Sequence, residues 1–93
     1  MKLHEFENCK SITESILELI SENRLKVTYL NISDSNESDY IWVLIGCVNK
    51  LNEEHLTKVI KHKFRNDDLN TLRFNKFGDI TRISFNLGIK EEE

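Results

Sequence analysis

The segment from Tyr40 to Val48 constrains the fold more than any other part of this chain. Eight of its nine residues are apolar or aromatic, and none is charged. Such β-branched and aromatic side chains favour a strand, and the run is too short to cross a bilayer, which requires about 20 apolar residues in a helix. We therefore predict a strand that is buried on both faces at the centre of a small sheet.

Two helices are predicted on either side of this strand. Ser11 and Glu14 match the capping-box pattern at the start of the first helix, and residues 1–10 form an arm or a short helix before it. Asn52 is a suitable N-cap for the second helix, and Glu53 and Glu54 favour its positive end. The apolar residues expected to face the core are Ile12, Ile16, Leu19 and Ile20 in the first helix, and Leu56, Val59, Ile60 and Phe64 in the second.

Three further strands are predicted from alternating residues. Residues 25–32 alternate until Leu30, where a change of phase indicates a β-bulge or an outward-facing apolar pair. Residues 33–39 form a polar loop, residues 71–75 alternate again, and Gly78-Asp79 marks a turn before a final strand over residues 81–89. The sequence thus predicts one α+β domain over residues 1–93, in α-β-β-α-β-β order, with a frayed acidic tail at 91–93. Its four-stranded, mostly antiparallel sheet would carry both helices on one face.

This arrangement supplies too little cover for the central strand. If both helices pack on one face, the second face of Tyr40–Val48 needs a second copy of the chain, the N-terminal residues or a partner protein. When the first half of the chain is aligned with the second at an offset of 40 residues, the apolar residues of the two helices coincide. The strands require a different offset. A degenerate αββ repeat is therefore an alternative, and a chance agreement is the preferred interpretation.

No arrangement of residues indicates a reaction. His55 and His62 are seven residues apart on one predicted helix, about 10.5 Å along its axis, which is too far for two ligands of one metal ion. Cys47 lies in the apolar strand, where a thiol is inert, and His4 and Cys9 have no convergent third ligand. The three glycines form no phosphate-binding loop. We therefore expect a protein that is not an enzyme and has no cofactor or metal site.

Charge is unevenly distributed along the chain. Residues 1–40 carry eight acids and four bases, whereas residues 41–90 carry nine bases and five acids. On the first helix, Glu14, Glu18 and Glu22 recur every four residues and form an acidic stripe opposite the core face. Such a stripe is usually only solvated, but it also suits a basic partner. We predict these three residues as a protein-binding surface.

A basic cluster is the alternative binding site. Five cationic or titratable residues of the second helix lie within eight positions that contain no acid, and three more follow on the final hairpin. Phosphate groups would be attracted to this set, provided that the helix and the hairpin present it on one surface. The residues are Lys58, Lys61, His62, Lys63, Arg65, Arg73, Lys76 and Arg82. The acidic pI of about 5.6 argues against a dedicated nucleic-acid-binding protein.

Composition suggests an origin and a class of function. The chain has no Pro, Ala or Gln but has ten Ile, ten Asn and nine Lys, which are encoded by A/T-rich codons. Its two cysteines suit a reducing cytoplasm, and no apolar leader follows Met1. We expect an accessory protein or inhibitor of a phage or mobile element that occludes a host protein. A homodimer is compatible with this hypothesis, and a small DNA- or RNA-binding regulator is the alternative.

Overall fold

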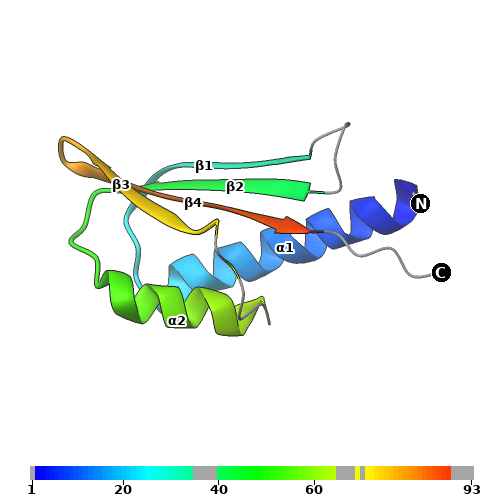
Figure 1. Ribbon diagram of the computed structural model, residues 1–93, viewed down its shortest axis with the longest axis horizontal. Coiled ribbons are helices and arrows are strands. Elements are labelled where there is room, and N and C mark those ends of the chain that lie inside the picture. The colour runs from blue at the N-terminus through cyan, green and yellow to red at the C-terminus, as the bar shows by residue number, and fades with distance from the viewer. Residues whose placement is uncertain (1, 35–39, 65–68, 70, 89–93) are drawn as a thin grey trace.

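A computed structural model describes residues 2–34, 40–64, 69 and 71–88 of the chain, with the side chains of residues 2–9, 34 and 88 left out. Two helices and four strands alternate in α-β-β-α-β-β order, and the strands form one antiparallel sheet in the order β1-β2-β4-β3. This confirms the predicted α+β fold (Figure 1). The elements are α1 (Lys2–Glu22), β1 (Val27–Asp34), β2 (Tyr40–Cys47), α2 (Glu53–Lys63), β3 (Arg73–Phe77) and β4 (Ile80–Gly88).

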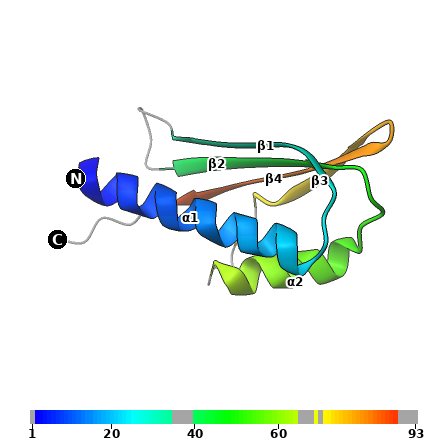
Figure 2. The same cartoon turned by 180° about the vertical axis from the view of Figure 1, so that it is seen from behind.

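The hydrophobic core lies between the sheet and the two helices. Both helices pack on the same face of the sheet, and the two opposite views agree on this arrangement (Figures 1 and 2). The helices contribute Ile16, Leu19, Leu56 and Ile60, which are 0–3% exposed. The two central strands contribute alternating buried residues, namely Ile41, Val43, Ile45 and Cys47 from β2 and Thr81, Ile83, Phe85 and Leu87 from β4.

The ends of the helices agree in part with the predictions. Asn52 caps α2 as expected, since its side-chain oxygen accepts a hydrogen bond of 3.0 Å from the His55 backbone N–H. The capping box predicted at Ser11 is wrong, because α1 already begins at Lys2 and continues through Ser11. No glycine or proline precedes Ser11, so nothing in the backbone chemistry of residues 2–10 interrupts the helix.

The predicted irregularity of β1 is present near the start of the strand. The pairing of β1 with β2 shifts between Val27 and Tyr29, which places the bulge before Leu30. After this shift Leu30 and Ile32 pack against the core. Tyr29 consequently lies on the opposite face of the sheet, although it alternates in phase with Leu25 and Val27 in the sequence.

The strand order has an approximate internal two-fold symmetry. The two αββ units meet at their second strands, the central pair β2 and β4, and their first strands β1 and β3 form the two edges. The buried positions of β2 recur in β4 at the same offset of 40 residues that relates the helices, as Ile41 and Thr81 illustrate. The expectation of a different offset is therefore wrong for the central strands. It is correct for the edge strands, because Asn31 and Arg73, which pair with Leu44 and Ser84, are 42 positions apart.

Candidate functional site

The helices leave one face of the sheet uncovered, and we call it the open sheet face. Residues paired across neighbouring strands point to the same side, so the register identifies its members. They are Tyr29, Asn31 and Ser33 of β1; Tyr40, Trp42, Leu44 and Gly46 of β2; Ile80, Arg82, Ser84 and Asn86 of β4; and Arg73, Asn75 and Phe77 of β3. Because α1 lies beside α2 on the other side, the N-terminal helix does not cover this face (Figures 1 and 2).

Four aromatic side chains of the open sheet face are exposed to solvent. The exposed fraction is 52% for Trp42, 47% for Tyr40, 54% for Phe77 and 37% for Tyr29. The prediction that β2 is buried on both faces is therefore wrong. The residues at odd positions of β2 enter the core, whereas the first two even positions carry Tyr40 and Trp42, aromatic residues with a polar group that can remain in water.

The ring of Tyr29 lies over the backbone of Gly46, its partner across β1 and β2. A Cβ atom at position 46 would collide with this ring, so glycine is required by the close approach. The neighbouring Thr28 hydroxyl donates a 3.2 Å hydrogen bond to the Gly46 carbonyl oxygen. The bulge and this glycine together place an aromatic ring on the open sheet face near the start of β1.

Arg82 pairs with Gly46 on the other side of β2, so it lies on the same face of the sheet as Tyr29. Its guanidinium carbon is 4.5 Å from the centroid of the Phe77 ring, a cation–π contact that holds the planar group on the face. Within the part of the chain that the structure describes, Arg82 forms no ion pair, and its shielded Nε has no hydrogen-bond partner. Arg82 is thus a fixed cation without a counter-charge among these residues.

Salt bridges join the predicted acidic stripe of α1 to the second helix, α2. Lys63 Nζ lies 3.2 Å from a carboxylate oxygen of Glu18 and 3.2 Å from one of Glu22. The hydrogen bond to Glu18, together with Glu22, raises the pKa of the Lys63 ammonium above its ordinary value, against a smaller lowering by desolvation. Two of the three predicted acidic residues therefore hold α1 and α2 together, and Glu14 is exposed on the same helix.

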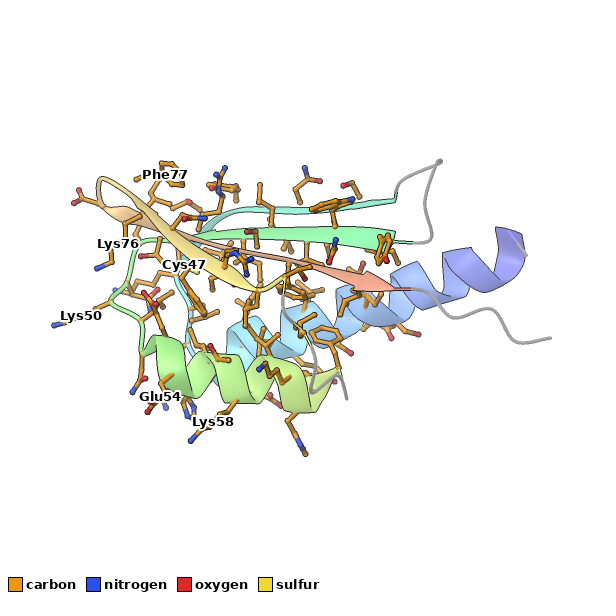
Figure 3. All side chains as sticks on the ribbon, in the orientation of Figure 1. Cys47, Lys50, Glu54, Lys58, Lys76 and Phe77 are labelled. Atoms are coloured by element: carbon orange, nitrogen blue, oxygen red, sulfur yellow. The ribbon has the colours of Figure 1, made fainter. Side chains whose placement is uncertain are left out.

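The predicted basic residues do not form one surface. Lys58, Lys61, His62 and Lys63 belong to α2, on the helix side of the sheet. Arg73 and Arg82 lie on the open sheet face, and Arg65 is outside the described residues. Lys76 pairs with the buried Thr81, so it lies on the side opposite Phe77. Figure 3 shows the separation, with Phe77 above the sheet and Lys58 on the outer side of α2.

The helix side also carries a shallow groove. Its lining combines two histidines and two lysines with one acid and one apolar residue: Glu22, His55, Lys58, Val59, His62 and Lys63. The described residues contain no group of three or more His, Cys, Asp or Glu side chains that could hold a metal ion. Burial raises the pKa of the Cys47 thiol, which keeps it protonated and unreactive.

The aromatic residues of the open sheet face are absent from the predicted sites. Within β2 the sequence does contain an indication, because Tyr40 and Trp42 alternate with the aliphatic residues Ile41 and Val43, which suit a core. Sequence periodicity alone does not show which alternate set is covered. None of the described helices is long and apolar enough to cross a membrane. Comparison of the chain with protein-family models, with curated proteins and with solved structures finds no match.

Proposed function

We propose that this protein is a non-enzymatic interaction protein that covers a surface of a partner protein with its open sheet face. The observation that carries the proposal is the exposure of Trp42 on a central strand of a sheet whose other face packs against both helices. An indole in this position contributes little to the core of the monomer and leaves a large apolar area in water. Contact with a partner would remove this area from water.

The composition of the open sheet face supports a protein partner. Buried centres of protein interfaces are enriched in Trp, Tyr, Phe and Arg and depleted of Lys, Asp and Glu. The open sheet face contains four exposed aromatic residues and two arginines, and no Lys, Asp or Glu occupies any of its positions. Asparagine and serine side chains account for most of its other residues and provide hydrogen-bonding groups.

Nucleic acid is the less favoured partner. Nonspecific affinity for DNA or RNA depends on the number of phosphates that cations neutralise. Arg73 and Arg82 supply only two cations on this face, while the lysines of α2 lie on the helix side. The mechanism that we propose is occlusion, and a phage or mobile-element origin would make the blocked protein a host protein in the cytoplasm, where the free thiol of Cys47 is stable.

The test is affinity capture from a lysate of the source cell, using wild-type protein and a Trp42→Ser variant as baits. Trp42 is half exposed, so this change should leave the fold intact, which circular dichroism can verify. We expect mass spectrometry to find a protein that the wild type retains and the variant loses. A Glu14→Gln/Lys58→Gln variant is the matched control on the helix side and should retain it.

Two results would contradict the proposal. Equal capture by wild type and Trp42→Ser would exclude the open sheet face as the binding surface. Loss of all captured protein after nuclease treatment would show that nucleic acid mediates the capture, and it would favour the alternative hypothesis of a nucleic-acid-binding protein.

A further inference from the structure

The open sheet face has a distinct distribution of charge. Its charged residues are Arg73 and Arg82, and none of its positions holds a carboxylate. The described carboxylates lie elsewhere, at α1, at the start of α2 and at Asp79 in the β3–β4 turn. A partner that buries Arg82 must supply its counter-charge, because a guanidinium removed from water without one is destabilising.

We infer that the partner is an acidic protein surface that places a carboxylate on Arg82 and an apolar side chain on Trp42. This inference rests on the proposed function and specifies the chemistry of the partner. Arg82 would form a bidentate pair with the carboxylate, and Trp42 would provide the apolar contact.

Arg82 is prepared for such a pair. Its guanidinium is held over the Phe77 ring at 4.5 Å, so little side-chain entropy remains to be lost on binding. It also forms no ion pair within the described part of the chain, so no internal carboxylate has to be displaced. By contrast, Lys63 on the helix side is already paired with Glu18 and Glu22. Arg82 is therefore the better anchor for an acidic group.

The spacing of the two anchors fits one segment of a partner. Trp42 pairs with Asn86 and Gly46 pairs with Arg82, so the anchors lie four residues apart along the neighbouring strands β2 and β4. At about 3.3 Å per residue, this separation is roughly 13 Å along the strands. An extended segment of about four residues spans it, as does a helix of about nine residues at 1.5 Å per residue.

A second copy of the chain fits the face less well. A two-fold dimer would place the same face of both copies in contact and bring together two Arg82 guanidinium groups, neither of which has an ion pair within the described residues. Contact with the acidic stripe of another copy would be head-to-tail, and it would compete with Lys63 for Glu18 and Glu22. Charge complementarity thus favours a different, acidic protein.

The experiment selects binders from a library of random 16-residue peptides displayed on phage, with counter-selection against the Trp42→Ser variant. Counter-selection removes peptides that still bind the Trp42→Ser variant, so the surviving peptides require Trp42 and bind the open sheet face. We expect them to be enriched in Asp and Glu and depleted of Lys and Arg relative to the input library. Their affinities, measured by calorimetry with synthetic peptides, should fall about 10- to 100-fold for Arg82→Gln. Lys58→Gln is the matched control for charge and should leave the affinities unchanged.

Arg82→Lys provides a second variant, because it keeps the charge and removes the planar fork. Its affinity should lie between those of wild type and Arg82→Gln. Trp42-dependent peptides that show no acidic enrichment, or that tolerate Arg82→Gln, would overturn the inferred chemistry and leave the proposed function standing. Failure to recover any Trp42-dependent peptide would overturn both.

Two further measurements test the other occupants of the face. Light scattering at about 100 μM that showed a Trp42-dependent dimer would replace the acidic partner by a second copy. Binding of a 15-residue oligothymidine that Arg82→Gln abolishes would replace it by nucleic acid. We expect a monomer in the first measurement and no Arg82-dependent binding in the second.

Discussion

Tyr29 and Gly46 pair across β1 and β2, and the tyrosine ring occupies the space into which a side chain at position 46 would project. The two residues must therefore be considered together. A bulge turns Tyr29 to the open sheet face, and a glycine leaves room for its ring on the sheet. This contact positions one of the four aromatic residues on which the proposed interface depends.

A Gly46→Ala change should consequently cost about 1–3 kcal/mol of the free energy of unfolding, because the ring or the strand must move. In a Tyr29→Ala background the obstacle is gone, and alanine should be neutral or stabilising by about 0.5–1 kcal/mol relative to glycine. Urea unfolding of the four proteins gives this coupling as a double-mutant cycle. Equal costs in both backgrounds would show that the ring of Tyr29 is not the obstacle.

Arg24 is a second position where the backbone limits the side chain. Its φ angle is 54°, in the left-handed region, at the point where α1 ends and the Leu25 N–H donates to the Ile20 carbonyl oxygen at 3.0 Å. This conformation costs an L-residue about 1 kcal/mol, whereas glycine adopts it freely. We expect Arg24→Gly to raise the free energy of unfolding by about 0.5–1 kcal/mol in urea titrations.

An Arg24→Ala variant is the control for that measurement, since it removes the same side chain and keeps the strained angle. It should be no more stable than wild type. If both variants changed stability equally, the effect would come from loss of the arginine side chain and not from the backbone.

The architecture follows from patterns that the sequence shows directly. The helical periodicity of Ile16, Leu19, Leu56 and Ile60 predicts the two core-facing surfaces, and the alternation around Ile83 predicts the last strand. These patterns are reliable because each depends on a single helix or strand that packs one of its faces on the same core. The Gly78-Asp79 turn is equally direct, since Gly78 has a φ angle of 65° that favours glycine.

The candidate site was harder to predict, because it depends on contacts between distant elements. Residues 40–48 are apolar at almost every position, so alternation could not show that Trp42 faces water while Val43 enters the core. The register that places Arg82 beside Gly46 is fixed by pairing between strands far apart in the sequence. Likewise, the acidic stripe gave no indication that Lys63 would neutralise part of it.

Lys63 should stabilise the contact between α1 and α2 through Glu18 and Glu22. We expect Lys63→Met to lower the midpoint of thermal unfolding at neutral pH and low salt, and Lys58→Met, which removes a charge outside this pair, to change it less. Salt should reduce the difference between the two variants, because both glutamates are largely exposed.

The same pair predicts a dependence on pH. The pKa of Lys63 is raised in the folded protein, so its contribution is fully present below the ordinary lysine value of about 10.4 and is lost as the pH rises through the folded value. The difference between the Lys63→Met and Lys58→Met variants should therefore disappear in strongly alkaline solution. A difference that persisted there would indicate lost packing of the lysine stem instead of a lost ion pair.

Cys47 provides a measure of opening of the core. Its side chain is fully buried on β2, and burial raises the pKa of its thiol. In a Cys9→Ser background, a thiol reagent such as dithiobis(nitrobenzoate) should react with Cys47 only as the protein opens, at a rate that increases with added urea. Above the ordinary thiol value of about 8.5, the unfolded chain ionises while the folded one does not, so the stability contributed by the buried thiol should fall as pH rises. A Cys9→Ser/Cys47→Ala protein lacks this titration and is the control. The unfolding free energy of the Cys9→Ser protein minus that of the control should decrease between pH 7 and pH 9.5. Rapid labelling that does not depend on urea would place Cys47 in contact with solvent and contradict its position in the core.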